Sequence, residues 1–192
     1  NVQALKDGLS KKGHEEARVA IMTTDTHYKE CAVEFEIDGK ICRMGTMCKG
    51  SGMIHINMGT MLSFITTDCA ISSKMLSKAL HESIAGTYNC VSVDGDTSTN
   101  DTLTIMANGL AKNKEIKKAE KNYDIFLAAL NKMNRVMAMK IAADGEGATR
   151  LIECNVNGAK SVEAARGLAK AIICSSLSKA AIFGADANFG RF

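Results

Sequence analysis

The feature that most constrains the fold is a short stretch of strict alternation that ends in a hairpin turn. In residues 32–38, valine, phenylalanine and isoleucine share one face, and acidic side chains share the other. This two-residue period predicts a half-buried strand. Asp38-Gly39 follows, a pair that favours a tight hairpin turn, so residues 41–44 are predicted to return as the neighbouring strand.

The rest of the chain alternates between strand and helix patterns. Further strands are predicted at residues 62–67, 89–93 and 150–156. Helices are predicted from Ser72 or Ser73 to Gly86, from Ser98 or Thr99 to Asn108, from 118 to about 139 and from 161 to 174, before a final apolar piece at 180–183. Strands covered by helices predict an α/β layered architecture. The pattern alone leaves open whether this is a layered sandwich or a doubly wound sheet.

Composition and charge exclude several classes of function. The net charge of +3 is too small to indicate nucleic-acid binding, and the local lysine cluster within residues 112–121 is predicted to be solvated. No apolar run approaches the roughly 20 residues of a membrane span, and the N-terminus has no signal-peptide pattern. The predicted location is therefore the cytoplasm. The seven cysteines include no C-x-x-C pair, and the four histidines have no partner at metal-ligand spacing, so no metal site is predicted.

A glycine-rich turn that begins at Lys49 leads to a Gly-Thr bond before an apolar strand. The hydroxyl of Thr60 can attack the carbonyl of Gly59, giving an ester that water opens and an α-amine beside the same hydroxyl. Thr60 is therefore a candidate for both cleavage site and nucleophile. The alternative is an ordinary turn-to-strand junction. His55 is a candidate acid or base, with a polar loop residue as the alternative.

Six blocks along the chain give this bond its context. They read MTTDT at 22–26, KGSGMI at 49–54, TML and FITTD at 60–62 and 64–68, SVDGDTSTND at 92–101, GEGAT at 145–149 and AIFGADAN at 181–188. In composition and order they resemble the ornithine acetyltransferase family, also called glutamate N-acetyltransferases, which act in arginine biosynthesis. The resemblance spans nearly the whole chain.

The resemblance implies a fold similar to the layered sandwiches of N-terminal-nucleophile hydrolases. It implies cleavage between Gly59 and Thr60 into α and β pieces that assemble, with Thr60 carrying acetyl from N-acetylornithine to glutamate without metal or cofactor. Thr23, Lys49 and Glu146 match the family's substrate-binding positions. Lys49 suits a substrate carboxylate and Glu146 a substrate ammonium.

The chain also departs from the family. The resemblance implies that residues 1–192 are the central part of the catalytic domain, with the oxyanion-hole residues before Asn1 and further substrate-binding residues after Phe192. There is no proline and no tryptophan, and positions where the family is expected to carry proline hold other residues, which are Tyr28, Ile56 and Ser176. Replacing proline loosens a turn. Two alternatives therefore remain: an aminopeptidase or amidohydrolase that passes the acyl group to water, and an inactive scaffold.

An acidic cluster in the fourth block offers a different interpretation. Asp94, Asp96, Asn100 and Asp101 carry oxygen ligands, but the later bidentate glutamate of a calcium loop is missing. Roles in Asx turns and caps explain the cluster better than a cation site.

Overall fold

The computed structural model describes residues 2–10, 12–55 and 61–191. The strands are β1 (Lys29–Ile37), β2 (Lys40–Lys49), β3 (Leu62–Thr67) and β4 (Thr102–Ala107). The helices are α1 (Val2–Asp7), α2 (His14–Ala20), α3 (Ser73–Gly86), α4 (Lys121–Ala143), α5 (Val162–Cys174) and α6 (Ser176–Phe183), with short 3₁₀ helices η1 (Tyr88–Cys90) and η2 (Phe189–Arg191).

The four strands form one mixed sheet in the order β1-β2-β3-β4. β1 and β2 are antiparallel, β2 and β3 are antiparallel, and β3 and β4 are parallel. The predicted hairpin is confirmed, because Asp38 and Gly39 connect β1 to β2 with φ angles of 48° and 74°. Two successive positive φ values match the right-handed twist of the paired strands. Antiparallel pairing of β2 and β3 places Lys49, the last residue of β2, beside Leu62, the first residue of β3.

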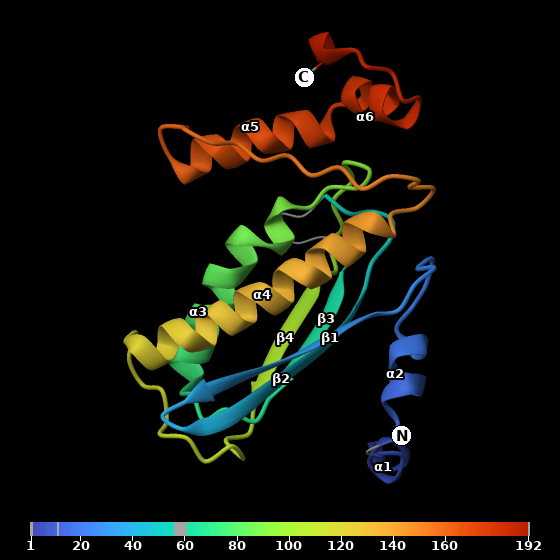
Figure 1. Ribbon diagram of the computed structural model, residues 1–192. Helices are drawn as coiled ribbons and strands as arrows, with labels where there is room; N and C mark the ends of the chain where they lie inside the picture. The colour runs from blue at the N-terminus through green and yellow to red at the C-terminus, as the bar shows by residue number, and fades with distance from the viewer. Residues whose placement is uncertain (1, 11, 56–60, 192) are drawn as a thin grey trace.

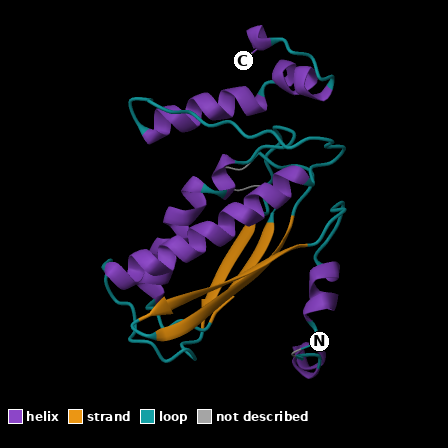
Figure 2. Cartoon of the chain, in the orientation of Figure 1, coloured by secondary structure: helices purple, strands orange, loops and turns teal. Residues whose placement is uncertain are grey.

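Helices α3 and α4 cover one face of the sheet (Figures 1 and 2). The buried stripe of α4 contains Tyr123, Phe126, Leu130, Met133 and Met137. The first four pack on Ile37, Cys42, Met44 and Ile65, which face inward from the strands, and on Met75 and Ala79 of α3, whereas Met137 belongs to a second cluster with Cys48 and Ile54. The predicted α/β class and layered arrangement are confirmed. In the described residues they take the form of one sheet under one layer of helices.

Three predictions of secondary structure are wrong. The predicted helix that begins at Ser98 or Thr99 is instead strand β4. Leu103, Ile105 and Ala107 alternate onto the core face, and β-branched threonines and isoleucine favour a strand, so pairing with β3 prevails over the helical interpretation.

The two other wrong predictions are strands. Residues 89–93 form a 3₁₀ turn and a single bridge between Ser92 and His55. Residues 150–156 pair with no strand in the described part of the chain, and without a neighbour a strand cannot satisfy its backbone.

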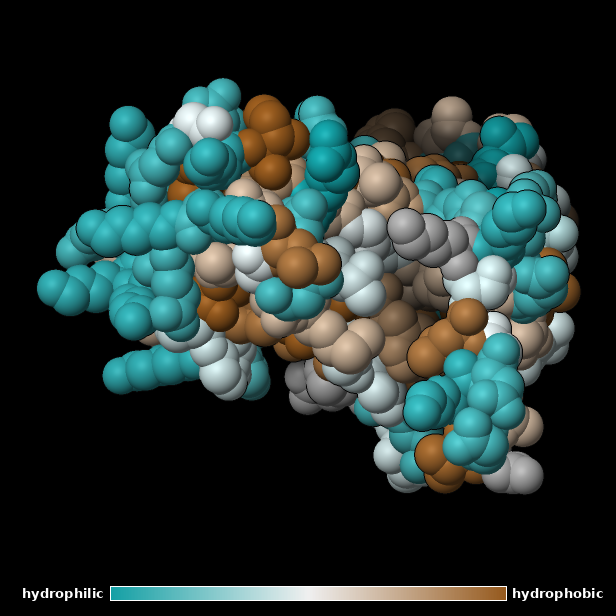
Figure 3. Space-filling model, turned by 90° about the horizontal axis from the view of Figure 1, so that it is seen from below, coloured by the Kyte–Doolittle hydropathy of each residue, from teal (hydrophilic) through white to brown (hydrophobic). Residues whose placement is uncertain are grey.

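α5 and α6 lie beyond the end of α4 that follows residue 140 (Figure 1). Their N-caps are Ser161 and Ser175, whose side chains accept backbone N–H groups of Ala164 and Ser178. Figure 3 shows the opposite end of the molecule, where hydrophilic side chains project from the rim and smaller hydrophobic patches lie between them. The five lysines within residues 112–121, which were predicted to be solvated, are all exposed. Among the described residues, no helix is long and apolar enough to cross a membrane.

Candidate functional site

The candidate site lies where β2 ends and β3 begins. Lys49 is the last residue of β2 and pairs with Leu62, the first residue of β3. The Nζ atom of Lys49 lies 3.5 Å from the hydroxyl oxygen of Thr23. Two of the predicted substrate-binding side chains therefore meet at this corner. The predicted cleavage point, Gly59 and Thr60, lies outside the described residues.

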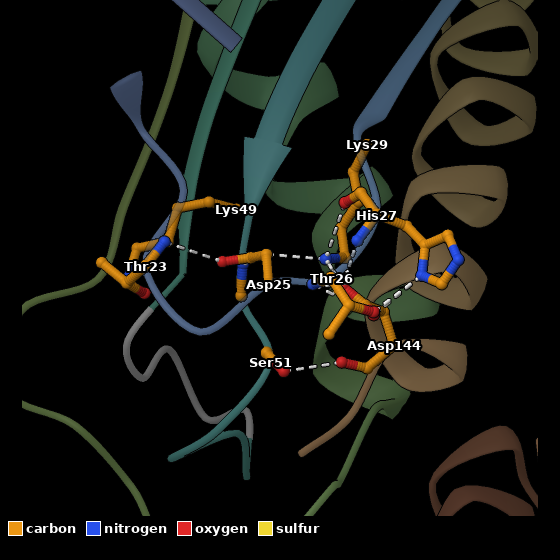
Figure 4. A network of polar contacts seen from close by, with 9 residues as sticks. Thr23, Asp25, Thr26, His27, Lys29, Lys49, Ser51 and Asp144 are labelled. Atoms are coloured by element: carbon orange, nitrogen blue, oxygen red, sulfur yellow. Dashed lines mark hydrogen bonds and ion pairs between the residues drawn. The ribbon is translucent and has the colours of Figure 1, made fainter. Parts of the chain in front are cut away.

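A buried ion network supports the loop that carries Thr23 (Figure 4). Lys29 Nζ donates to Asp25 Oδ1 at 2.6 Å and to Asp144 Oδ2 at 2.5 Å. The three side chains are nearly inaccessible, with exposed fractions of 1% for Lys29, 0% for Asp25 and 6% for Asp144. Because a buried charge is tolerated only when it is paired and hydrogen-bonded, the network fixes the relative positions of β1, the 23–27 loop and the end of α4.

Further hydrogen bonds complete the network. Asp144 accepts the backbone N–H and the hydroxyl of Thr26, and its Oδ1 atom lies 3.1 Å from His27 Nδ1. Asp25 accepts the N–H of Gly50 at 2.7 Å, and Ser51 donates its hydroxyl to the Asp144 carbonyl at 2.6 Å. The glycine-rich turn after Lys49 is thus attached to the carboxylate of Asp25 and to the backbone of Asp144.

The two carboxylates are held in their charged form. Burial alone would raise the pKa of Asp144, but hydrogen bonds from Lys29, Thr26 and His27 outweigh it, so this pKa lies well below its usual range. Burial likewise opposes ionisation of Asp25, yet the Gly50 N–H and Lys29 lower the pKa of this group overall.

Glu146 lies against the same turn. Its backbone N–H donates to the Ser51 carbonyl at 3.1 Å. A Cβ atom at Gly52 would come within 2.5 Å of the Glu146 carboxyl carbon, so a larger residue at Gly52 would displace this carboxylate. In the described part of the chain, no hydrogen bond or ion pair joins the Glu146 carboxylate to Lys49 or Thr23. The structure therefore places Glu146 beside the turn, without a described hydrogen bond or ion pair to the other two predicted residues.

The acidic cluster acts mainly on backbone amides. Asp94 accepts the N–H groups of Met53 at 2.6 Å and Ile54 at 3.0 Å. It also accepts the N–H of Asp96 at 3.1 Å, which confirms the Asx-turn interpretation for this aspartate, whereas the next element among the described residues is strand β4 and not a helix that it could cap. His55 Nδ1 lies 2.9 Å from the hydroxyl of Ser92 and 3.8 Å from the Cys174 sulfur.

Sequence reasoning missed the buried Asp25, Lys29 and Asp144. One signal was present in the sequence. Lys29 is an odd-numbered residue of β1 and therefore lies on the same face as Val33, Phe35 and Ile37, the apolar face of this strand. A lysine in phase with buried positions requires a carboxylate partner, and Asp25 is four residues away. No local signal indicated Asp144, which lies 115 residues from Lys29 along the chain.

Comparisons with known proteins show the family to which the chain belongs. A family model described as the ArgJ family matches residues 1–192. The arginine biosynthesis bifunctional protein ArgJ of Caldanaerobacter subterraneus subsp. tengcongensis is 53% identical over 183 residues, which cover 95% of this chain and 45% of that protein. The protein of the same name from Symbiobacterium thermophilum is 48% identical over 190 residues, covering 99% of this chain and 47% of that protein.

A solved structure shares the fold. The crystal structure of arginine biosynthesis bifunctional protein ArgJ from Bacillus halodurans matches with a TM-score of 0.63 and 45% sequence identity, covering 66% of this chain and 59% of that one. The α/β fold is therefore one that a solved structure shares, and the chain belongs to the ArgJ family. It spans about half the length of the curated relatives it matches.

Proposed function

We propose that the chain contributes the nucleophile and part of the substrate site of an acetyltransferase that moves acetyl from N-acetylornithine to glutamate in arginine biosynthesis. The observation that carries the proposal is family membership over residues 1–192. The chain is 53% identical over 183 residues to a protein named for arginine biosynthesis. The contact between Lys49 and Thr23 at the start of β3 supports it.

The proposed reaction begins with self-cleavage. The Thr60 hydroxyl attacks the Gly59 carbonyl carbon, the peptide bond breaks, and water hydrolyses the resulting ester. The freed α-amine of Thr60 is then the base for its own hydroxyl. Cleavage divides the polypeptide into α and β pieces that we propose remain assembled.

Acetyl transfer follows by two displacements. The Thr60 hydroxyl attacks the acetyl carbonyl of N-acetylornithine, forming an acetyl ester and releasing ornithine. The amine of glutamate attacks that ester, giving N-acetylglutamate and restoring the hydroxyl. We propose that Lys49 and Thr23 hold the substrate carboxylate and that Glu146 pairs with its ammonium group, with no metal or cofactor. The proposed compartment is the cytoplasm.

The test is a Thr60→Ala substitution in the complete polypeptide that contains residues 1–192. Intact mass should change from two fragments meeting between Gly59 and Thr60 to one uncut chain, and acetyl transfer should disappear. Thr66→Ala, a matched control on an exposed position of β3, should leave both unchanged.

Two results would contradict the proposal. Cleavage or transfer that survives Thr60→Ala would exclude this nucleophile. Release of acetyl to water at a rate that glutamate does not increase would favour an amidohydrolase, because the acceptor would then have no role.

A further inference from the structure

One loop, formed by residues 92–102, contacts the chain on both sides of the proposed cleavage point. On the N-terminal side it holds Met53 and Ile54, whose N–H groups donate to Asp94. The Ile54 carbonyl accepts the N–H of Val93 at 2.6 Å, and the hydroxyl of Thr97 donates to the carbonyl of His55 at 3.3 Å. The backbone before the cleavage point is therefore fixed from this loop.

On the C-terminal side the loop holds Met61. The N–H of Met61 donates to Asp101 Oδ1 at 2.5 Å, and its carbonyl accepts the N–H of Thr102 at 2.9 Å. Both backbone polar groups of Met61 are thus engaged, and the residue is 1% exposed. The amide nitrogen of Met61 is bonded directly to the carbonyl carbon of Thr60, so these contacts fix the first described peptide group after the proposed nucleophile.

The Asp101 carboxyl group is in an unusual environment. Its Oδ2 atom is buried and has no hydrogen-bond partner among the described residues. Burial raises the pKa of Asp101, while the Met61 N–H and the charge of Lys49 act in the opposite direction. The one described hydrogen bond of the Asp101 carboxyl group is the bond that it accepts from the Met61 N–H.

We propose that Asp101 is a positioning residue for the proposed cleavage between Gly59 and Thr60, because it holds the Met61 amide that follows Thr60, and that Asp94 holds the chain on the other side of the cleavage point. The inference rests on the proposed function of Thr60. Attack requires reacting atoms about 3–3.5 Å apart, and a misplacement of about 1 Å costs roughly 100-fold in rate. Asp101 acts through the backbone and does not itself transfer a proton or an acyl group.

The experiment compares variants in the complete polypeptide. Asp101→Ala removes the acceptor for the Met61 N–H and should slow cleavage, followed by intact mass over time, by about 100-fold. Asp101→Asn keeps an acceptor oxygen and should restore the rate to within a few-fold of the unsubstituted polypeptide. Asp96→Ala is the matched control, since this exposed aspartate is in the same loop and its carboxylate makes no described hydrogen bond.

A second readout separates positioning from general destabilisation. In the fraction that does cleave, Asp101→Ala should lower kcat for acetyl transfer and leave KM for N-acetylornithine nearly unchanged. Asp94→Ala and Asp94→Asn provide a second pair on the opposite flank, with the same expected order, if Asp101→Ala does not fold.

Each outcome decides between distinct conclusions. Cleavage at the unsubstituted rate in Asp101→Ala and Asp94→Ala would overturn the inference. So would an Asp101→Asn variant as slow as Asp101→Ala, because the acceptor oxygen would then not be the important feature. An unsubstituted polypeptide that is never cleaved would instead overturn the proposed function, and the inference with it.

Discussion

At the scale of single residues, Lys29 is a buried cation between two carboxylates. Its amine donates to Asp25 and Asp144 at 2.6 and 2.5 Å, and its side chain is 1% exposed. Ion pairs on the surface contribute little, but removing one member of a buried set leaves the others unpaired. The candidate site at Lys49 and Thr23 is therefore supported by Lys29, a side chain that is not itself part of the site.

We expect Lys29→Met to lower the free energy of unfolding by about 3–5 kcal/mol, because two buried carboxylates lose their cation. Urea denaturation measures this change. The control is Arg43→Met, which removes the exposed pair with Glu34 and should cost about 0–1 kcal/mol. Equal losses for the two variants would show that the buried network has no special role.

The same network predicts the effect of pH. The pKa values of Asp25 and Asp144 are lowered in the folded protein, so the unfolded chain binds protons first as the pH falls. Their contribution to stability should be complete well above an unfolded pKa of about 3.9, and should be lost as the pH falls from there toward the folded values. Urea midpoints between pH 6 and 3 test this. Asp144→Asn should flatten the decline, and an unchanged slope would contradict the assignment.

At the scale of elements, local signals predicted the helices α3, α4 and α5 and the hairpin, but not α1 or α2. α3 begins at its predicted cap, α4 buries its predicted stripe, and the Asp38-Gly39 turn adopts the expected conformation. These features depend on residues within a few positions of each other. β4 was missed because a strand of six residues is defined by its partner β3, which a local pattern does not contain.

The cap of α3 provides a prediction at this scale. Ser72 accepts the N–H of Met75 at 3.4 Å, and Ser72→Ala should lower the free energy of unfolding by about 1 kcal/mol, within a range of roughly 0.5–2. Thermal or urea unfolding measures the change. Ser73→Ala is the neighbouring control, inside the helix and exposed, and should change stability by less than about 0.5 kcal/mol. A larger loss at Ser73 would place the helix start elsewhere.

At the scale of the whole molecule, the chain is unevenly packed. The sheet, α3 and α4 share two hydrophobic clusters, whereas α5 has no buried residue among those described. The irregular segment of residues 147–160 joins the two parts and is largely exposed. Regions with few buried contacts open at lower free energy than the core.

We therefore expect limited trypsin digestion of residues 1–192 to cut at Arg150 or Lys160 before it cuts within α4. Lys132 is an internal control, since it is exposed but lies in a helix anchored by Leu130 and Met133. Mass spectrometry of early time points identifies the cuts. Early cleavage at Lys132 would mean that α4 opens as readily as the segment after it.

By itself the sequence determined the hairpin, the capped helices, the α/β class and the blocks that relate the chain to its family, because turn chemistry and periodicity act over a few residues. The tertiary structure decided the rest. Lys29 meets Asp144 across 115 residues, and Asp101 meets Met61 across 40. Such pairs depend on which strands become neighbours and which polar groups are buried together, and no local pattern records either.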